Sequence, residues 1–136
     1  MLSAIGVVWS IDAIQRRSAL EAFEATLAAA RPGETLDIRD AFSLPWDRVV
    51  IVGPYEPGAS ANISLGFDHY GEYEGLVEGD SGQFIIFVKD QTVVADLRNW
   101  GPTWFDSRID SFDRASAVFT RSAGGLLLPA RGNEGP

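Results

Sequence analysis

The sequence predicts an α+β domain in which one long N-terminal helix packs on a face of an antiparallel sheet, with short connecting helices. Three observations lead to this prediction. Apolar residues recur at spacings of three and four between residues 10 and 30, residues 82–100 have a β-hairpin pattern, and elsewhere short apolar runs alternate with turn residues. The length of 136 residues and the hydrophobic content of 46% suit one globular domain, which we assign to residues 15–128.

The helix is predicted between Ser10 and Ala30, where charged residues separate an apolar stripe. The stripe consists of Ala13, Leu20, Phe23, Leu27 and Ala30. Pro32 cannot continue a helix and Gly33 permits a turn, so we expect the helix to end there.

The N-terminal segment, residues 1–14, is apolar and carries no charge before Asp12. It is shorter than the ~20 residues that span a bilayer, and it lacks the basic n-region of a signal peptide. Two alternatives remain open. The segment is either an apolar helix start packed on the domain, or the C-terminal part of a membrane anchor, for which Trp9 followed by Arg16 and Arg17 suits the interfacial end.

Two segments after the helix favour strands. Residues 35–42 alternate in polarity and fit either a short strand or a helix that starts at Asp37 or Asp40. Residues 47–55 contain four consecutive β-branched residues, which predict a strand covered on both faces.

A short helix is predicted within residues 57–67, with Ser60 or Asn62 as its N-cap and Gly66 as its C-cap.

The C-terminal half contains the clearest strand signal. Phe84–Val88 and Thr92–Arg98 are joined by three polar residues and predict a β-hairpin. Residues 112–125 fit either a helix or a strand, and residues 129–136 are predicted to be a disordered tail.

Composition excludes several kinds of function. The net charge of −8, from 11 basic and 19 acidic residues, argues against nucleic acid as a partner. The absence of cysteine removes thiolate metal sites, cysteine nucleophiles and disulfides, and a single histidine, His69, leaves little room for a hydrolytic triad or a zinc site. No nucleotide-binding glycine motif occurs. We therefore expect no cofactor, no metal and no catalytic residue.

Aromatic residues are the candidates for partner contact. The stretch SLPWDRVVIVGPYEPG, residues 43–58, has Trp46 at one end of the predicted strand and Tyr55 at the other. We interpret Trp46 as core, because its neighbour Asp47 has only Arg48 beside it and no nucleophile. The residues that could contact a partner are Tyr55, Trp100, Trp104 and Phe105, and the alternative for the last three is to close the end of the sheet.

Carboxylates gather in two places. Residues 67–82 hold five of them, but the ligand spacing of a calcium-binding EF-hand is missing, so we interpret the segment as a solvated acidic loop that carries an exposed His69. Asp106, Asp110 and Asp113 have spacings that would place them on one helical face. We favour a surface helix there over a paired-carboxylate hydrolase.

The pattern W-D-x-V-x(4)-P-Y, followed by a short helix ending in Leu-Gly and a two-strand unit with Phe-Val, resembles an uncharacterised family of small bacterial exported proteins, many of them lipoproteins. The matching residues are Trp46, Asp47, Val49, Pro54, Tyr55, Leu65, Gly66, Phe87 and Val88. The resemblance covers residues 44–98 and implies a surface-tethered domain without known chemistry. The missing lipobox cysteine favours a peptide anchor.

These observations predict a non-catalytic accessory domain, exported or tethered to a membrane, that acts by contact with a protein partner, such as a membrane complex. We expect it to be membrane-anchored or extracytoplasmic. The alternative is a small acidic inhibitor or immunity-type protein, whose charge would suit the blockade of a basic active site.

Overall fold

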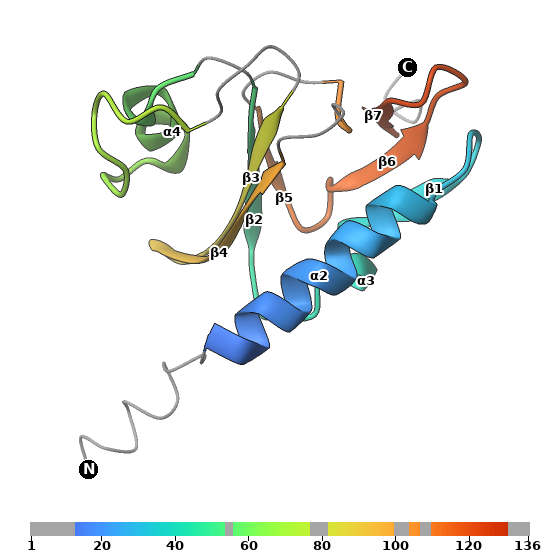
Figure 1. The fold of residues 1–136 in the computed structure, drawn as a ribbon, viewed down its shortest axis with the longest axis horizontal. Helices are drawn as coiled ribbons and strands as arrows, with labels where there is room; N and C mark the ends of the chain where they lie inside the picture. Colours follow the sequence, from blue (N-terminus) through green and yellow to red (C-terminus); the bar gives the residue numbers. More distant parts are fainter. Residues whose placement is uncertain (1–12, 54–55, 77–81, 100–103, 107–109, 131–136) are drawn as a thin grey trace.

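The computed structural model describes residues 13–53, 56–76, 82–99, 104–106 and 110–130. Its elements are α2 (Ala13–Ala29), β1 (Thr35–Asp37), α3 (Ile38–Ala41), β2 (Arg48–Val52), α4 (Gly58–Leu65), β3 (Gln83–Lys89), β4 (Thr92–Asn99), β5 (Asp110–Asp113), β6 (Val118–Arg121) and β7 (Leu127–Pro129). The strands form two antiparallel sheets, in the orders β4-β3-β2-β5 and β1-β6-β7 (Figure 1). This architecture confirms the predicted α+β class with a long N-terminal helix.

The four-stranded sheet stands between two helices, with α2 on one side and α4 on the other (Figure 1). Alternate residues of β2 therefore enter two separate cores. Val49 and Ile51 belong to the core that holds the buried side chains of α2, which we call the α2 core. Val50 and Val52 belong to the core beneath α4, which we call the α4 core. The prediction of a strand covered on both faces is confirmed.

Helix α2 contacts the sheet through a narrow stripe. The buried residues of the helix are Ala19, Phe23 and Leu27. The Phe23 ring packs edge-on against Phe87 of β3 at 5.0 Å between ring centroids. The predicted stripe was wrong at its ends, because Ala13 is exposed and Ala30 is only half buried. The N-terminal end of the helix extends past the sheets, and its C-terminal end lies beside β1 (Figure 1).

The predicted hairpin is confirmed as β3 and β4, joined by a two-residue turn at Asp90 and Gln91. Asp90 adopts a φ of 57°, a left-handed conformation that aspartate tolerates better than most residues. The side chain of Asp47 accepts a hydrogen bond from the Asp90 N–H at 2.8 Å, which holds the turn. The register shifts between Phe87 and Val88, where β4 gains one residue in a β-bulge.

Residues 35–42 form both elements that the sequence left open. β1 ends at Asp37, and this residue is also the N-cap of the short helix α3, its carboxylate accepting a hydrogen bond from the Arg39 N–H at 3.0 Å.

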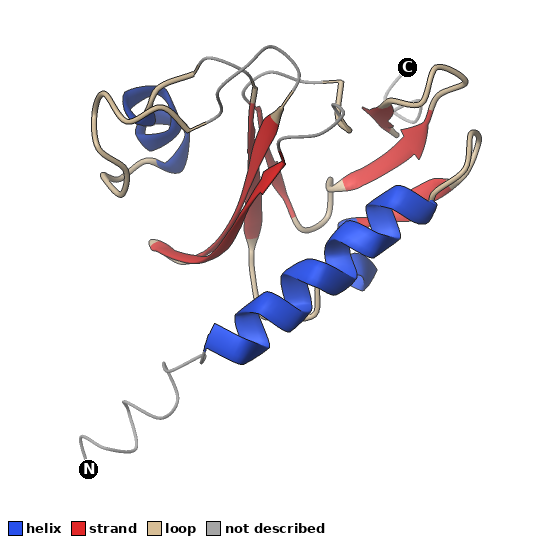
Figure 2. Cartoon of the chain, viewed as in Figure 1, coloured by secondary structure: helices blue, strands red, loops and turns tan. Residues whose placement is uncertain are grey.

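The second sheet lies beside the C-terminal half of α2, and β6 is its central strand (Figure 2). Of the two alternatives for residues 112–125, the strand is correct, since β5 ends at Asp113 and β6 spans Val118–Arg121. The predicted domain boundary at Leu128 falls inside β7, and the N–H of Ala130 still donates to the Val118 carbonyl at 2.8 Å. The folded part therefore reaches at least Ala130, while residues 131–136 of the predicted tail lie outside the described part.

Candidate functional site

The surface with most features of a binding site consists of helix α4 and the loop of residues 66–76, which together we call the α4 face. The predicted N-caps, Ser60 and Asn62, were wrong. The helix starts after Pro57, which provides no side-chain cap, and the N–H groups of Gly58 and Ala59 donate instead to loop carbonyls at 2.8 and 3.0 Å. A tertiary contact thus satisfies donors that a capping side chain usually satisfies.

The two ends of α4 depend on glycine. Gly66 has a φ of 85° and ends the helix as the predicted C-cap. At the other end, a Cβ on Gly58 would lie 1.9 Å from the carbonyl oxygen of Gly71. Only a residue without a side chain lets the loop approach the helix this closely.

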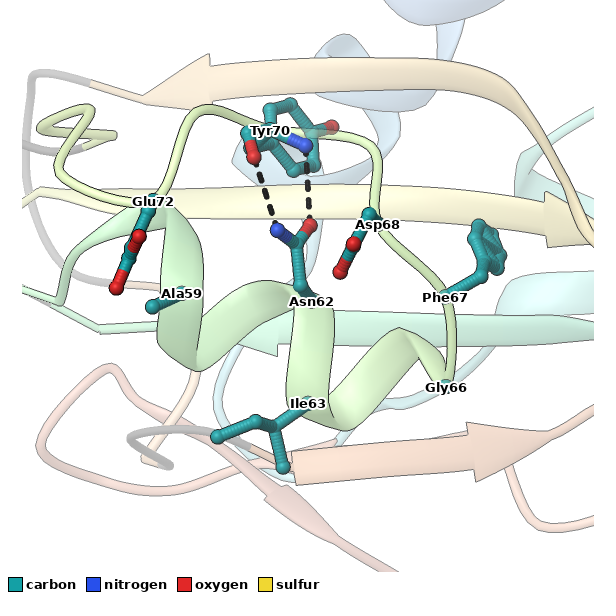
Figure 3. Close-up of a pocket in the computed structure, with 8 residues that line it drawn as sticks. All are labelled: Ala59, Asn62, Ile63, Gly66, Phe67, Asp68, Tyr70 and Glu72. Carbon is teal, nitrogen blue, oxygen red and sulfur yellow. Dashed lines mark hydrogen bonds between the residues drawn. The ribbon is translucent and has the colours of Figure 1, made fainter.

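Asn62 fixes the loop against the helix. Its Nδ2 donates to the Tyr70 carbonyl at 2.8 Å, and its Oδ1 accepts from the Tyr70 N–H at 3.0 Å (Figure 3). The same Oδ1 accepts from the His69 N–H at 2.9 Å. One amide side chain therefore satisfies three backbone groups of the loop.

Tyr70 joins the loop to the sheet. Its hydroxyl donates to Asp96 of β4 at 2.7 Å, and its ring packs edge-on against Phe84 of β3 with 5.3 Å between ring centroids. Burial, together with the charge and hydrogen bond of Asp96, raises the pKa of Tyr70 above its ordinary value of 10.0. The phenol therefore stays protonated and acts as a structural donor.

An open pocket of about 540 Å³ lies between α4 and the loop (Figure 3). It is lined by Ala59, Asn62, Ile63, Gly66, Phe67, Asp68, Tyr70 and Glu72. Asp68 and Glu72 extend from the loop toward the helix on either side of Asn62, and Ile63 stands at the far edge of the helix (Figure 3). The volume is that of a site for a small molecule or a side chain.

The charge of the α4 face is negative. Asp68 and Glu72 are exposed, as is His69, which agrees with a solvated acidic loop for the described residues up to 76. The nearby arginines are engaged by other groups. Arg98 pairs with Glu74 at 3.3 Å, and Arg48 donates to the last carbonyls of α4.

Two large apolar side chains on the α4 face are exposed. Ile63 is 81% exposed on α4, and Tyr73 is 87% exposed on the loop. The described part of the chain exposes only two other large hydrophobic residues, Ile14 and Leu128. The α4 face thus combines a pocket, negative charge and exposed apolar surface.

Trp46 is a core residue, as the sequence predicted. It is 2% exposed, its ring packs edge-on against Phe87 at 5.8 Å between centroids, and the Arg114 guanidinium lies over it at 4.8 Å. Tyr55, at the other end of the stretch, lies outside the described residues.

The aromatic residues that were candidates for partner contact do not form a surface in the described part. Trp104 is 8% exposed and Phe105 is fully buried, so both belong to the α2 core, and their assignment to a contact surface is corrected. Buried Gln83 holds them, since its Oε1 accepts from both of their N–H groups and its Nε2 donates to the Phe105 carbonyl. Trp100 lies outside the described residues.

The expected helical face of Asp106, Asp110 and Asp113 does not exist. Asp110 and Asp113 lie in strand β5, and Asp106 follows an isolated β-bridge at Phe105. Strand pairing with β2 decided the conformation there. Within the described ranges, no group of three acidic or histidine side chains could hold a metal ion.

Sequence reasoning missed Ile63 and Tyr73 as exposed residues, and the loop-holding amides of Asn62 and Gln83. The only signal for Ile63 was its place between the two polar residues Asn62 and Ser64 in a short helix. An amide residue directly before a buried apolar run, as at Gln83, is compatible with a buried polar partner.

Of the segment predicted to contact a membrane, the structure describes only Ala13 and Ile14, at the start of α2, where Ile14 is 80% exposed. Among the described helices, none combines the length and apolar character that crossing a bilayer requires.

Comparisons with protein-family models, with curated proteins and with solved structures found no match to this chain.

Proposed function

We propose that this protein is a non-catalytic binding module that docks a protein partner on the α4 face. The observation that carries the proposal is the exposure of Ile63, which lines an open acidic pocket, and of Tyr73 on the same loop as Asp68 and Glu72. Large apolar and aromatic side chains beside a pocket are typical of the anchor residues of interfaces. The net charge of −8 favours a partner with a basic surface.

The chemistry of the α4 face supports binding rather than catalysis. Tyr70 is held as a hydrogen-bond donor to Asp96, so it is a poor general base. The ring of His69 packs edge-on against Tyr70 with 4.6 Å between centroids. Asn62 uses its amide on the backbone of the loop.

We also propose that residues 1–14 hold the module at a membrane or on a membrane complex. The apolar sequence of this segment and the exposure of Ile14 support this proposal. In the alternative, an inhibitor of an enzyme with a basic active site, the α4 face would bind that enzyme.

The proposal is tested by a photo-crosslinking amino acid placed at position 63 or 73 of the full chain, with position 128 as the matched exposed control. Crosslinking in native membranes should give the same protein adduct from positions 63 and 73 and none from position 128. Substitution of both Ile63→Ser and Tyr73→Ser should abolish capture of that protein, whereas Leu128→Ser should not.

Equal capture by all these variants, or no adduct from positions 63 and 73, would contradict the proposal. The identity of the captured protein distinguishes a membrane complex from a soluble enzyme.

A further inference from the structure

We propose that the pocket between α4 and the loop receives one cationic side chain, the guanidinium or ammonium group of an arginine or lysine, from a segment of the partner. This inference rests on the proposed function and names the chemistry that the α4 face recognises.

The pocket exists before any ligand arrives, because its walls are fixed by contacts inside the protein. Three hydrogen bonds from Asn62 hold the backbone at His69 and Tyr70, and the bond between the Tyr70 hydroxyl and Asp96 holds the tyrosine ring. The close approach of Gly58 to Gly71 fixes the other end of the loop. A preformed pocket reduces the entropy lost on binding.

The charges at the pocket are not neutralised within the described part of the chain. Neither Asp68 nor Glu72 has a side-chain hydrogen bond or an ion pair with another described residue. Two arginines are close in the fold, but both are bound elsewhere. Arg48 donates to carbonyl groups of α4. Arg98 pairs with Glu74 and lies over the Phe84 ring. A ligand cation can therefore pair with Asp68 or with Glu72 without competition from a described arginine.

The lining of the pocket favours an organic cation over a bare metal ion. The carboxylates of Asp68 and Glu72 lie on opposite sides of Asn62 and do not converge on one point (Figure 3). Phe67 and Tyr70 are among the lining residues, and aromatic residues suit the methylene stem and the charge of a long basic side chain. Carboxylates bind a guanidinium through charge-assisted hydrogen bonds.

The exposed residues next to the pocket favour a peptide segment over a free amine. Ile63 lines the pocket and Tyr73 follows Glu72 in the chain, and the residues flanking an arginine can cover the apolar surface that both expose. A free polyamine, such as spermidine, would leave that surface exposed to water.

The test uses the isotopically labelled full chain and two blocked peptides that differ in one group, acetyl-Ala-Leu-Arg-Leu-Ala-amide and the same peptide with citrulline in place of arginine. Citrulline has nearly the same shape as arginine but no charge. The arginine peptide should shift the amide resonances of residues 59–72 in a saturable way, with a Kd at least about tenfold lower than that of the citrulline peptide, a difference of about 1.4 kcal/mol. Added salt should weaken the arginine peptide selectively.

The variant with both Asp68→Asn and Glu72→Gln should lose at least about tenfold in affinity for the arginine peptide, while Glu24→Gln, an exposed acid on α2, should not change it. Unchanged melting temperatures will show that the variants fold. Equal binding of the two peptides, no binding of the arginine peptide, or shifts elsewhere in the chain would overturn the inference. Tighter binding of spermidine at the same amides would overturn the choice of a peptide.

The same variants separate this inference from the proposed function. If the crosslinked partner is still captured by the Asp68→Asn and Glu72→Gln variant but not by the Ile63→Ser and Tyr73→Ser variant, the α4 face binds the partner without a cation in the pocket. If both variants capture it like the wild type, the proposed function fails as well.

Discussion

At the scale of single residues, two side-chain amides hold loops of this domain in place. Gln83 is fully buried and bonds three backbone groups at Trp104 and Phe105, and Asn62 does the same for the loop of the α4 face. A side-chain amide offers both a donor and an acceptor, so it can replace a missing strand neighbour. Each amide thereby fixes a loop that carries aromatic residues.

Trp46→Ala should lower the free energy of unfolding by about 3–5 kcal/mol, the range for removal of a large buried aromatic side chain. Trp46 is 2% exposed and contacts both Phe87 and the Arg114 guanidinium. Urea unfolding of the variant measures the change, with Tyr73→Ala as a control that should stay within about 0.5 kcal/mol because Tyr73 is 87% exposed. An unchanged midpoint for Trp46→Ala would remove this residue from the core.

The stability of the protein should fall at alkaline pH in a way that depends on Tyr70. Burial and Asp96 raise the pKa of Tyr70 above 10.0 in the folded protein. Above pH 10 the unfolded chain therefore loses the Tyr70 proton while the folded protein keeps it, so the contribution is complete below pH 10 and declines as the pH rises above it.

Urea unfolding of the wild type and Tyr70→Phe between pH 8 and pH 11 checks this dependence. The other tyrosines titrate equally in both proteins, so the difference between the two isolates Tyr70. The wild type should be more stable by about 1 kcal/mol below pH 10 because of the bond to Asp96, and this advantage should shrink above pH 10. A constant difference across the range would show that the Tyr70 pKa is not raised.

At the scale of elements, an arginine from a strand binds carbonyl groups at the C-terminal end of each of the two longer helices that the structure describes, α2 and α4. Arg48 of β2 donates to the Ser64 and Leu65 carbonyls of α4 at 2.9 and 2.7 Å. Arg121 of β6 donates to the Leu27 carbonyl near the end of α2. A cation at the C-terminus of a helix satisfies free carbonyls and interacts favourably with the helix dipole.

Gly58→Ala should destabilise the protein by about 1–3 kcal/mol, because the new methyl group would overlap the Gly71 carbonyl, 1.9 Å from the position of the Cβ. Thermal unfolding measures the effect, and loss of the loop contact should also weaken binding on the α4 face. The matched control is Gly75→Ala in the same loop, where a Cβ meets nothing within 4 Å. Equal stability of the two variants would show that the loop does not need to approach the helix closely.

At the scale of the whole molecule, the four-stranded sheet joins two cores that carry different parts of the proposed function. The α2 core faces the helix that follows the apolar N-terminal segment, and the α4 core supports the α4 face (Figure 1). We expect changes in one of these parts to leave the other intact.

Deletion of residues 1–14 should leave the melting temperature nearly unchanged and make the protein more monodisperse. The first buried residue of α2 is Ala19, and Ile14 is 80% exposed, so the described core does not depend on the deleted segment. An exposed apolar run promotes association. Calorimetry and light scattering check the two expectations, and unfolding of the truncated protein would show that the segment is part of the core.

The sequence by itself determined the elements whose pattern is local. The four β-branched residues of 49–52 predicted a strand buried on both faces, and the pattern of residues 84–98 predicted the β3–β4 hairpin. Gly66 could be recognised as a helix end, since glycine is the residue best suited to a left-handed C-cap. These features depend on neighbours in the chain, which a single sequence contains.

Only the tertiary structure decided the features that depend on distant partners. Residues 110–113 form a strand because β2 offers an edge to pair with. Trp104 and Phe105 are buried where Gln83 binds their backbone. The start of α4 is capped by carbonyl groups of the loop. The acidic pocket likewise arises from a contact between Asn62 and a loop eight residues later in the chain. Local propensities for these segments are weak, so the free energy of long-range packing and hydrogen bonding selects their conformation.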